Sequence, residues 1–184
     1  MQASASRALP FERWSTSDRL PRGFLVSGAL LGIGLGGFVD GIVLHQVLQW
    51  HHMLTATGHH PANTVSGLET NTLWDGLFHS LTWVATVCGL YGLWISAPVH
   101  RPGWGVALVG LLAIGWGAFN LVEGVIDHHI LGIHHVRDDV AEPLPWDLAF
   151  LALGAVLVAV GYALVRKGQS NGEVAGREFE ARPG

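Results

Sequence analysis

Residues 40–52 read DGIVLHQVLQWHH, and residues 123–135 read EGVIDHHILGIHH. The two stretches align without a gap, so that an acid, a glycine and three histidines recur in one register. The matched pairs are Asp40 with Glu123, Gly41 with Gly124, His45 with His128, His51 with His134, and His52 with His135. Acids and histidines are costly in apolar surroundings and are kept there mainly for function. Each stretch therefore predicts half of a metal site that is present twice.

The rest of the chain is apolar enough for a membrane protein. It has 184 residues, of which 49% are hydrophobic and 13% are charged. About 20 mostly apolar residues cross a bilayer as a helix, and four stretches are long enough, at approximately 24–50, 73–96, 104–129 and 146–165. They predict an all-α membrane protein, a bundle of four transmembrane helices. The single cysteine, Cys88, excludes an intrachain disulfide.

A fainter repetition links the second and fourth spans. Leu73–Trp74–Asp75 opens the second, and Pro145–Trp146–Asp147 opens the fourth. The bundle is therefore expected to consist of two parallel two-helix repeats, related by an axis along the membrane normal. Small residues every fourth position, such as Gly28, Gly32 and Gly36, allow close helix packing and predict that the first and third helices are central neighbours.

Basic residues predict the orientation. Nine of the ten lie before the first span, between the second and third, or after the fourth: Arg7, Arg13, Arg19, Arg22, Arg101, Arg166, Lys167, Arg177 and Arg182. Arg137 alone lies on the other side. The positive-inside rule then places both termini in the cytoplasm and the histidine-rich end on the extracytoplasmic side. We divide the chain into a cytoplasmic segment at 1–22, a transmembrane domain at 23–167 and a disordered cytoplasmic tail at 168–184.

Helical rise predicts which side chains share a depth. At about 1.5 Å per residue, His45, His79 and His128 lie at one level, roughly 7 Å inside the outer interface. Three imidazoles from three helices suit zinc, copper or iron. Asp40 and Glu123 lie deeper by about the same distance, and complete a predicted set of imidazole and carboxylate ligands.

Further acids and histidines surround this set. Asp75 and Asp127 are candidate ligands, partners that orient the imidazoles, or catalytic bases. At about 100° per residue, Asp40 and His45 lie on different faces of a straight helix, which requires either two metal positions or one metal with supporting carboxylates. The outer histidines are candidate ligands or a solvated rim: His51, His52, His134 and His135.

Three motifs carry a resemblance to a known family. They are DGIVLHQ at 40–46, TLWDGLFH at 72–79 and NLVEGVIDHH at 120–129. The chain resembles an uncharacterised family of predicted bacterial four-helix membrane proteins, rich in histidine and acid and known only as a domain of unknown function. The resemblance supplies no activity. It implies a bacterial cytoplasmic (inner) membrane location and a respiratory or oxidase-assembly partner.

The chemistry of these residues leaves several functions open. A redox metalloenzyme would hold one or two ions, iron before copper, and act on dioxygen, a peroxide or a lipid-soluble reductant. A zinc-dependent hydrolase would use Asp75 or Asp127 as base. Metal delivery or storage without catalysis would use the outer histidines together with the loop pair His59 and His60 to collect ions from solution. A b-type haem protein would use His45 and His128 as axial ligands, which the deep acids disfavour.

A proton or ion conductor lacks a polar path to the cytoplasm, because the inner halves of the spans are apolar. The expected partners are the lipid bilayer, metal ions and further copies of the chain as a homo-oligomer, and not nucleic acid.

Overall fold

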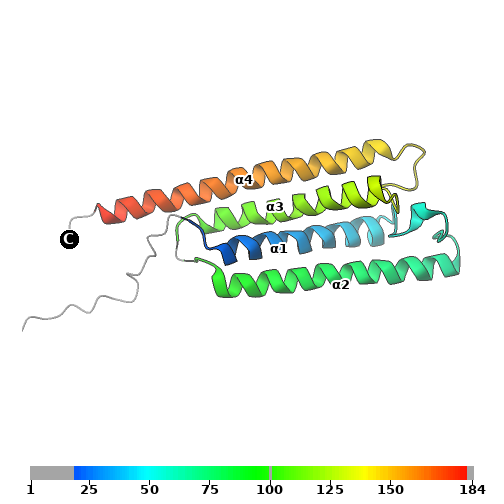
Figure 1. Cartoon of the computed structure of the whole chain (residues 1–184), viewed down its shortest axis with the longest axis horizontal. Coiled ribbons are helices and arrows are strands. Elements are labelled where there is room, and N and C mark those ends of the chain that lie inside the picture. Colours follow the sequence, from blue (N-terminus) through cyan, green and yellow to red (C-terminus); the bar gives the residue numbers. More distant parts are fainter. Residues whose placement is uncertain (1–18, 100, 182–184) are drawn as a thin grey trace, which may run out of the picture.

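The computed structural model describes residues 19–99 and 101–181, which form four long helices and, within those ranges, no strand. The α-helices are α1 (Arg22–Val39), α2 (Val65–Ser96), α3 (Trp104–Glu123) and α4 (Leu144–Glu180). α1 continues as the π-helix η2 (Asp40–Val47), α3 continues as the π-helix η4 (Gly124–Ile130), and a 3-10 turn, η3 (Thr55–Thr57), lies in the first connection (Figure 1). The predicted all-α class is confirmed.

Each of the four helices is long and apolar enough to cross a membrane. The candidate spans are Arg22–Val47, Val65–Ser96, Trp104–Ile130 and Leu144–Glu178. The second begins earlier than predicted, because Thr64 caps it by accepting a hydrogen bond from the Gly67 amide at 3.1 Å.

The predicted disordered tail is wrong for residues 168–180, since α4 continues to Glu180. The physical reason is packing against the start of α3. A side chain at Gly168 would collide with Ala107, which shows how closely the two backbones approach. Three of the basic residues used to predict the orientation lie outside the described residues, namely Arg7, Arg13 and Arg182.

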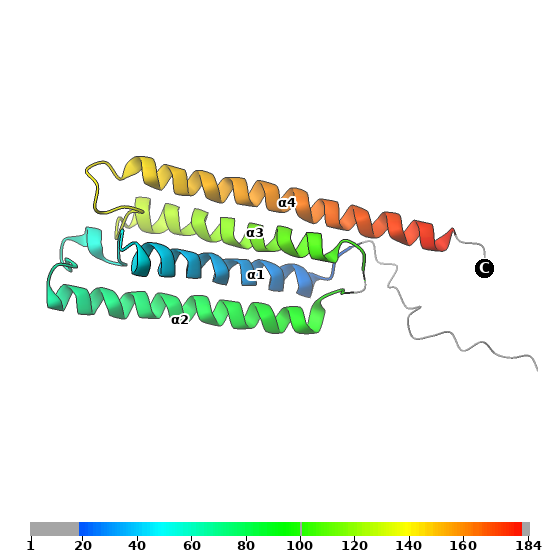
Figure 2. The same cartoon turned by 180° about the vertical axis from the view of Figure 1, so that it is seen from behind.

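The helices lie in the order α2, α1, α3, α4 across the molecule (Figures 1 and 2). α1 packs on α2 and α3, while α3 packs on α1 and α4, so the prediction that the first and third helices are neighbours is confirmed. Glycine makes the central crossing close: a side chain at Gly115 would strike the Ala29 carbonyl, and one at Gly32 would strike the backbone of Leu112.

The two ends of the bundle differ in their interiors. At one end a small apolar core contains Leu20, Phe24, Ala107 and Leu111. At the other end the fully buried side chains are polar: His45, His51, His134, Asn71, Asn120, Asp75 and Asp147. Large apolar side chains such as Trp94 and Leu81 cover the outside, as expected where lipid is the solvent.

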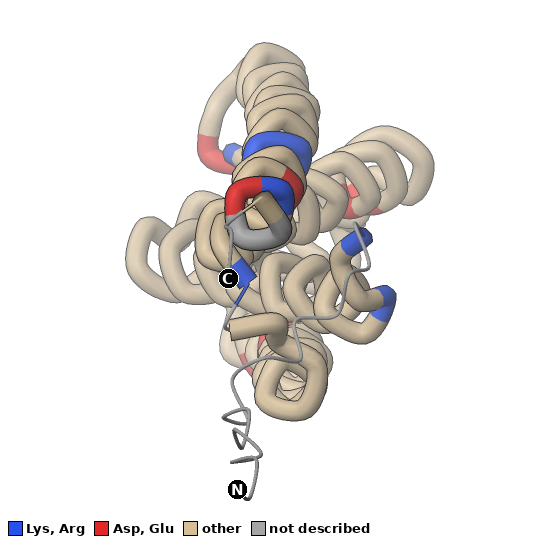
Figure 3. Tube along the Cα trace, turned by 90° about the vertical axis from the view of Figure 1, so that its left-hand side faces the viewer, with Lys and Arg blue, Asp and Glu red and all other residues tan. Residues whose placement is uncertain are grey.

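The described basic residues gather at the apolar-core end. The start of α1 with Arg22, the connection with Arg101, and the last turns of α4 with Arg177 meet there (Figure 3). The opposite end carries Arg137. The polar interior therefore lies at the end with little positive charge.

Candidate metal centre

The π-helices bring an acid and a histidine onto one face. In a straight α-helix, residues five apart point roughly 140° away from each other, whereas the i→i+5 hydrogen bonds of a π-helix place them nearly in line. Such bonds run from the Leu48 amide to the Val43 carbonyl at 2.8 Å and from the Leu131 amide to the Ile126 carbonyl at 2.7 Å. In η2 the result is a distance of 3.1 Å between His45 Nε2 and Asp40 Oδ2.

After each π-helix the chain turns back over the bundle. The turns use backbone with positive φ, at Gln49 (51°) and Gly132 (57°). The reversal carries His51 and His134 inward, where both are buried, with 2% and 0% of their surface exposed. A straight helix would point its acids and histidines in different directions. The backbone avoids this, because His51 and His134 lie in the turns that follow the helices and not on the helices themselves.

Asp75, on α2, orients one pair of histidines. His45 Nδ1 donates to Asp75 Oδ1 at 2.9 Å, and His52 Nδ1 donates to Asp75 Oδ2 at 2.8 Å. The Met53 amide donates to the first oxygen at 3.1 Å. A histidine whose Nδ1 carries the proton presents a lone pair on Nε2, the arrangement of carboxylate–histidine–metal sites.

Asp147, on α4, has a matching set of neighbours. His135 Nδ1 donates to its Oδ2 at 2.7 Å, the Val136 amide donates to its Oδ1 at 2.9 Å, and His128 Nδ1 lies 3.4 Å from Oδ1. Asp147 thus has the same kinds of neighbour as Asp75, with the difference that His45 is hydrogen-bonded to Asp75 whereas His128 makes no hydrogen bond to Asp147.

His51 and His134 are held by crossed backbone contacts. His51 Nδ1 donates to the Val136 carbonyl at 2.9 Å, and His134 Nδ1 donates to the Met53 carbonyl at 3.3 Å. Their rings stack in parallel with centroids 4.6 Å apart. Each Nε2 is consequently a lone-pair donor directed into the protein.

The inward-facing atoms form a buried cluster of acceptors. Six of them have no partner outside the cluster, although two, His45 Nε2 and Asp40 Oδ2, lie 3.1 Å from each other: Nε2 of His45, His51, His128 and His134, Oδ2 of Asp40 and Oε2 of Glu123. Three overlapping groups bring their ligand atoms within 4.8 Å of one another: His45–His51–His134, Glu123–His128–His134 and Asp40–His45–Glu123. Buried acceptors that face one another without donors are costly, so the cluster calls for protons or metal cations.

Burial sets the protonation of the two loop histidines. Burial lowers the pKa of His51, and electrostatic repulsion of His51 by His134 and by His45 lowers it further. The pKa of His134 is lowered by burial and by His45. Both imidazoles are therefore neutral at physiological pH, which is the state that binds metal.

The structure sorts the predicted site residues into three sets. It brings together Asp40, Glu123, His45, His51, His128 and His134. His52 and His135 turn their Nδ1 atoms to Asp75 and Asp147. His79 and Asp127 lie outside the three groups.

The shared depth of His79 does not bring it into the cluster. His79 Nδ1 donates to the Asp75 carbonyl of its own helix at 2.7 Å, and its ring packs beside Gly41. Asp75 and His79 lie on one face of α2, but the Nδ1 atom of His79 is bound to its own helix and its Nε2 faces Gly41 rather than the other histidines.

Two polar residues of the site were not predicted as site residues. Asp147 corresponds to Asp75 in the fainter repetition, and this correspondence is the sequence feature that could have predicted its contact with a histidine. Asn120 on α3 is buried, with Oδ1 unpartnered, and stands three residues before Glu123 in a quoted motif.

The outer end is covered by a cation between two indoles. The Arg137 guanidinium lies 4.8 Å from the Trp50 ring and 4.8 Å from the Trp146 ring. Asp138 ties the two connections together, accepting from Thr55 Oγ1 and from the His135 amide. These contacts pack the two connections together at the histidine-rich end of the bundle.

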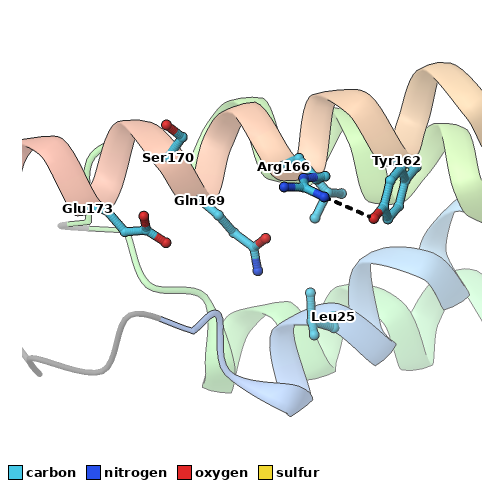
Figure 4. A pocket seen from close by; sticks show the side chains of 7 residues that line it. Leu25, Tyr162, Arg166, Gln169, Ser170 and Glu173 are labelled. Atoms are coloured by element: carbon cyan, nitrogen blue, oxygen red, sulfur yellow. Dashed lines mark hydrogen bonds between the residues drawn. The ribbon is translucent and has the colours of Figure 1, made fainter.

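The described part of the bundle is hollowed at its polar end and at its apolar-core end. One hollow, of about 340 Å³, lies between α1, α2 and α3 and reaches Glu123 and Asp127. The other, of about 460 Å³, lies between α1 and α4 at the opposite end, where Arg166 donates to the Tyr162 hydroxyl (Figure 4). The first hollow borders the cluster.

Residues 27–168 match the family described as "Predicted membrane protein (DUF2243)". The chain belongs to this family. The DUF2243 match includes the six clustered residues and both supporting carboxylates, and its description states a membrane location without an activity. No curated protein and no solved structure matches the chain.

Proposed function

We propose that the protein is a membrane metalloenzyme that holds a pair of redox-active transition-metal ions inside the bundle. The observation that carries the proposal is the set of four inward Nε2 atoms beside two buried carboxylates. Three of the four histidines donate Nδ1 to a carboxylate or carbonyl, and the fourth, His128, has Asp147 at 3.4 Å. Orienting contacts of this kind are typical of metal-ligating histidines.

The ligands form overlapping groups that suit two ions. Glu123, His128 and His134 form one close group and would hold one ion. The other ion would lie at His45, which shares a close group with Asp40 and Glu123 and another with His51 and His134. The matching contacts of Asp75 and Asp147 support this division and the predicted parallel repeat behind it. Carboxylate–histidine sites for two metal ions are known from other four-helix bundles.

The ligand chemistry favours iron. Nitrogen-rich ligation disfavours magnesium and calcium, which prefer oxygen, and a copper(I) site would be expected to use thiolate or thioether. Cys88 is exposed and Met53 contributes backbone groups to the site. Iron with four imidazoles and two carboxylates remains the first choice, with zinc and copper as alternatives.

The surroundings favour redox chemistry over the other functions. A zinc hydrolase needs water at the metal, whereas the candidate ligands are almost completely buried, with 0–5% of their surface exposed. A haem needs open space between its axial ligands, and the imidazoles instead stand 4.3–4.9 Å apart between successive ring centroids. A delivery protein would offer exposed ligands, and the outer His52 and His135 are occupied by carboxylates.

The positive-inside rule supports the orientation predicted from the sequence. The basic end would lie in the cytoplasm of a bacterial cell, and the metal centre would lie in the extracytoplasmic half of the inner membrane.

Metal analysis of detergent-purified protein tests the proposal. We expect about two iron ions per chain, reduced to one or none in His51→Ala. His59→Ala is the matched control, since His59 is an exposed loop histidine. Wild-type protein that binds no iron, zinc or copper after reconstitution would overturn the proposal.

A further inference from the structure

The hollow beside the cluster lies within the membrane-spanning part of the protein. Its walls include Ile33 of α1, Phe78 of α2, and Phe119 and Val122 of α3, and its polar groups are Glu123 and Asp127. Val122 is 58% exposed, which places the opening on the outer surface of the bundle where lipid would lie. A molecule entering here comes from the bilayer.

The polar groups of the hollow select hydrogen-bond donors. Glu123 Oε1 lies 3.6 Å from His134 Nε2, while Oε2 is buried and unpartnered. Asp127 stands one turn further along the same side of the helix and lines the same hollow. A carboxyl group pairs with a hydroxyl group whether it is ionised or protonated, so the hollow suits a ligand with hydroxyl groups.

The aromatic wall leads directly to the metal ligands. The ring of Phe78 stacks on His45, with centroids 5.8 Å apart and planes 14° apart, and its centroid lies 6.0 Å from that of Phe119. A flat aromatic head placed against these rings would stand one residue away from a metal-ligating imidazole on one side and next to Glu123 on the other.

We propose that the hollow binds the head group of a membrane-soluble hydroquinone, which donates electrons to the metal pair. This inference rests on the proposed function. A hydroquinone combines two hydroxyl donors, a flat ring and an apolar tail, which match the carboxylates, the aromatic wall and the lipid opening. A simple lipid alcohol matches the donors and the tail but has no electrons to give.

The reaction balances with the groups present. Oxidation of one hydroquinone to quinone breaks two O–H bonds and releases two electrons and two protons. The metal pair, when bound in its oxidised form, would supply the acceptor for the two electrons, one to each ion. The two protons pass to water, so the hollow has to hold the hydroxyl groups but need not keep their protons.

Anaerobic mixing of the iron-loaded, oxidised protein with decylubiquinol tests the inference. We expect one quinone formed for every two iron ions reduced, followed by absorption. Val122→Trp fills the hollow and Asp127→Asn removes an acceptor, and each should keep its iron but slow reduction by about ten-fold or more. Val109→Trp is the matched control, because Val109 lies on the same helix, is equally exposed (57%) and is remote from the hollow.

The outcomes separate the two proposals. Protein that binds iron and is reduced by dithionite but not by decylubiquinol would overturn the hydroquinone and leave the metal centre standing. Equal rates in wild type and both hollow variants would overturn the assignment of the hollow. Protein without iron would remove the metal centre and the inference together.

Discussion

At the scale of single residues, the chemistry depends on which nitrogen of each histidine faces inward. Asp75 accepts from Nδ1 of His45 and thereby directs its Nε2 to the centre, while Asp147 accepts from His135 and lies 3.4 Å from Nδ1 of the inward His128. Residue types and spacing predicted that acids and histidines would gather here. They could not predict that adjacent histidines make different contacts. His52 and His135 bind the supporting carboxylates, whereas His51 and His134 turn inward.

Replacing Asp75 should weaken metal binding without removing a ligand. Asp75→Asn keeps the shape but loses the charge that holds the Nδ1 protons of His45 and His52. We expect affinity for iron to fall about 10–100-fold, measured by competition with a chelator. Glu69→Gln removes an exposed acid from the same helix and should change nothing. Unchanged affinity in Asp75→Asn would show that the carboxylate does not position the ligands.

Acid should destabilise the metal-free protein through the loop histidines. His51 and His134 have pKa values below the ordinary 6.5 because they are buried. The unfolded chain therefore binds more protons below pH 6.5, and stability falls as the pH drops from there. The loss is on the order of 1 kcal/mol per histidine per pH unit. Thermal unfolding of apoprotein at pH 7.5 and 5.5 measures it, and His51→Gln should flatten the dependence.

At the scale of helices, the decisive features are the π-helices η2 and η4, which continue α1 and α3. The spans themselves were predictable, because long apolar stretches need no detail to be recognised. The two π-helices could not be predicted, because the shift to i→i+5 hydrogen bonds depends on packing against neighbouring helices and leaves no periodic pattern in the sequence. Gln49, a non-glycine residue with positive φ, likewise gives no warning.

The close crossing of α1 and α3 should be indispensable for the metal centre. Gly115→Leu places a side chain against the Ala29 carbonyl and forces the two central helices apart. We expect a loss of about 1–3 kcal/mol in stability and loss of iron, since each helix carries half of the ligands. Gly105→Leu adds the same side chain to α3 where nothing lies within 4 Å and is the control. Thermal unfolding and metal content of both variants would decide, and equal behaviour would contradict the prediction.

At the scale of the whole molecule, the bundle has an apolar core at its basic end and a polar centre at the other. Fold class and the central pair of helices followed from the hydropathy and glycine spacing. The tail was mispredicted because composition alone does not reveal that α4 continues to pack on α3. His79 was predicted from depth, a one-dimensional quantity, whereas a metal site is decided by direction.

The orientation of the bundle determines where protons released at the centre would go. In a Cys88→Ser background, Asn63→Cys in the first connection should react with a membrane-impermeant maleimide in intact cells. Glu178→Cys at the end of α4 should react only after the membrane is permeabilised, because the basic end is expected in the cytoplasm. The opposite labelling would place the metal centre on the cytoplasmic side. With the predicted orientation, the centre would lie in the extracytoplasmic half of the membrane, so oxidation of a lipid-soluble donor there would release its protons outside the cell.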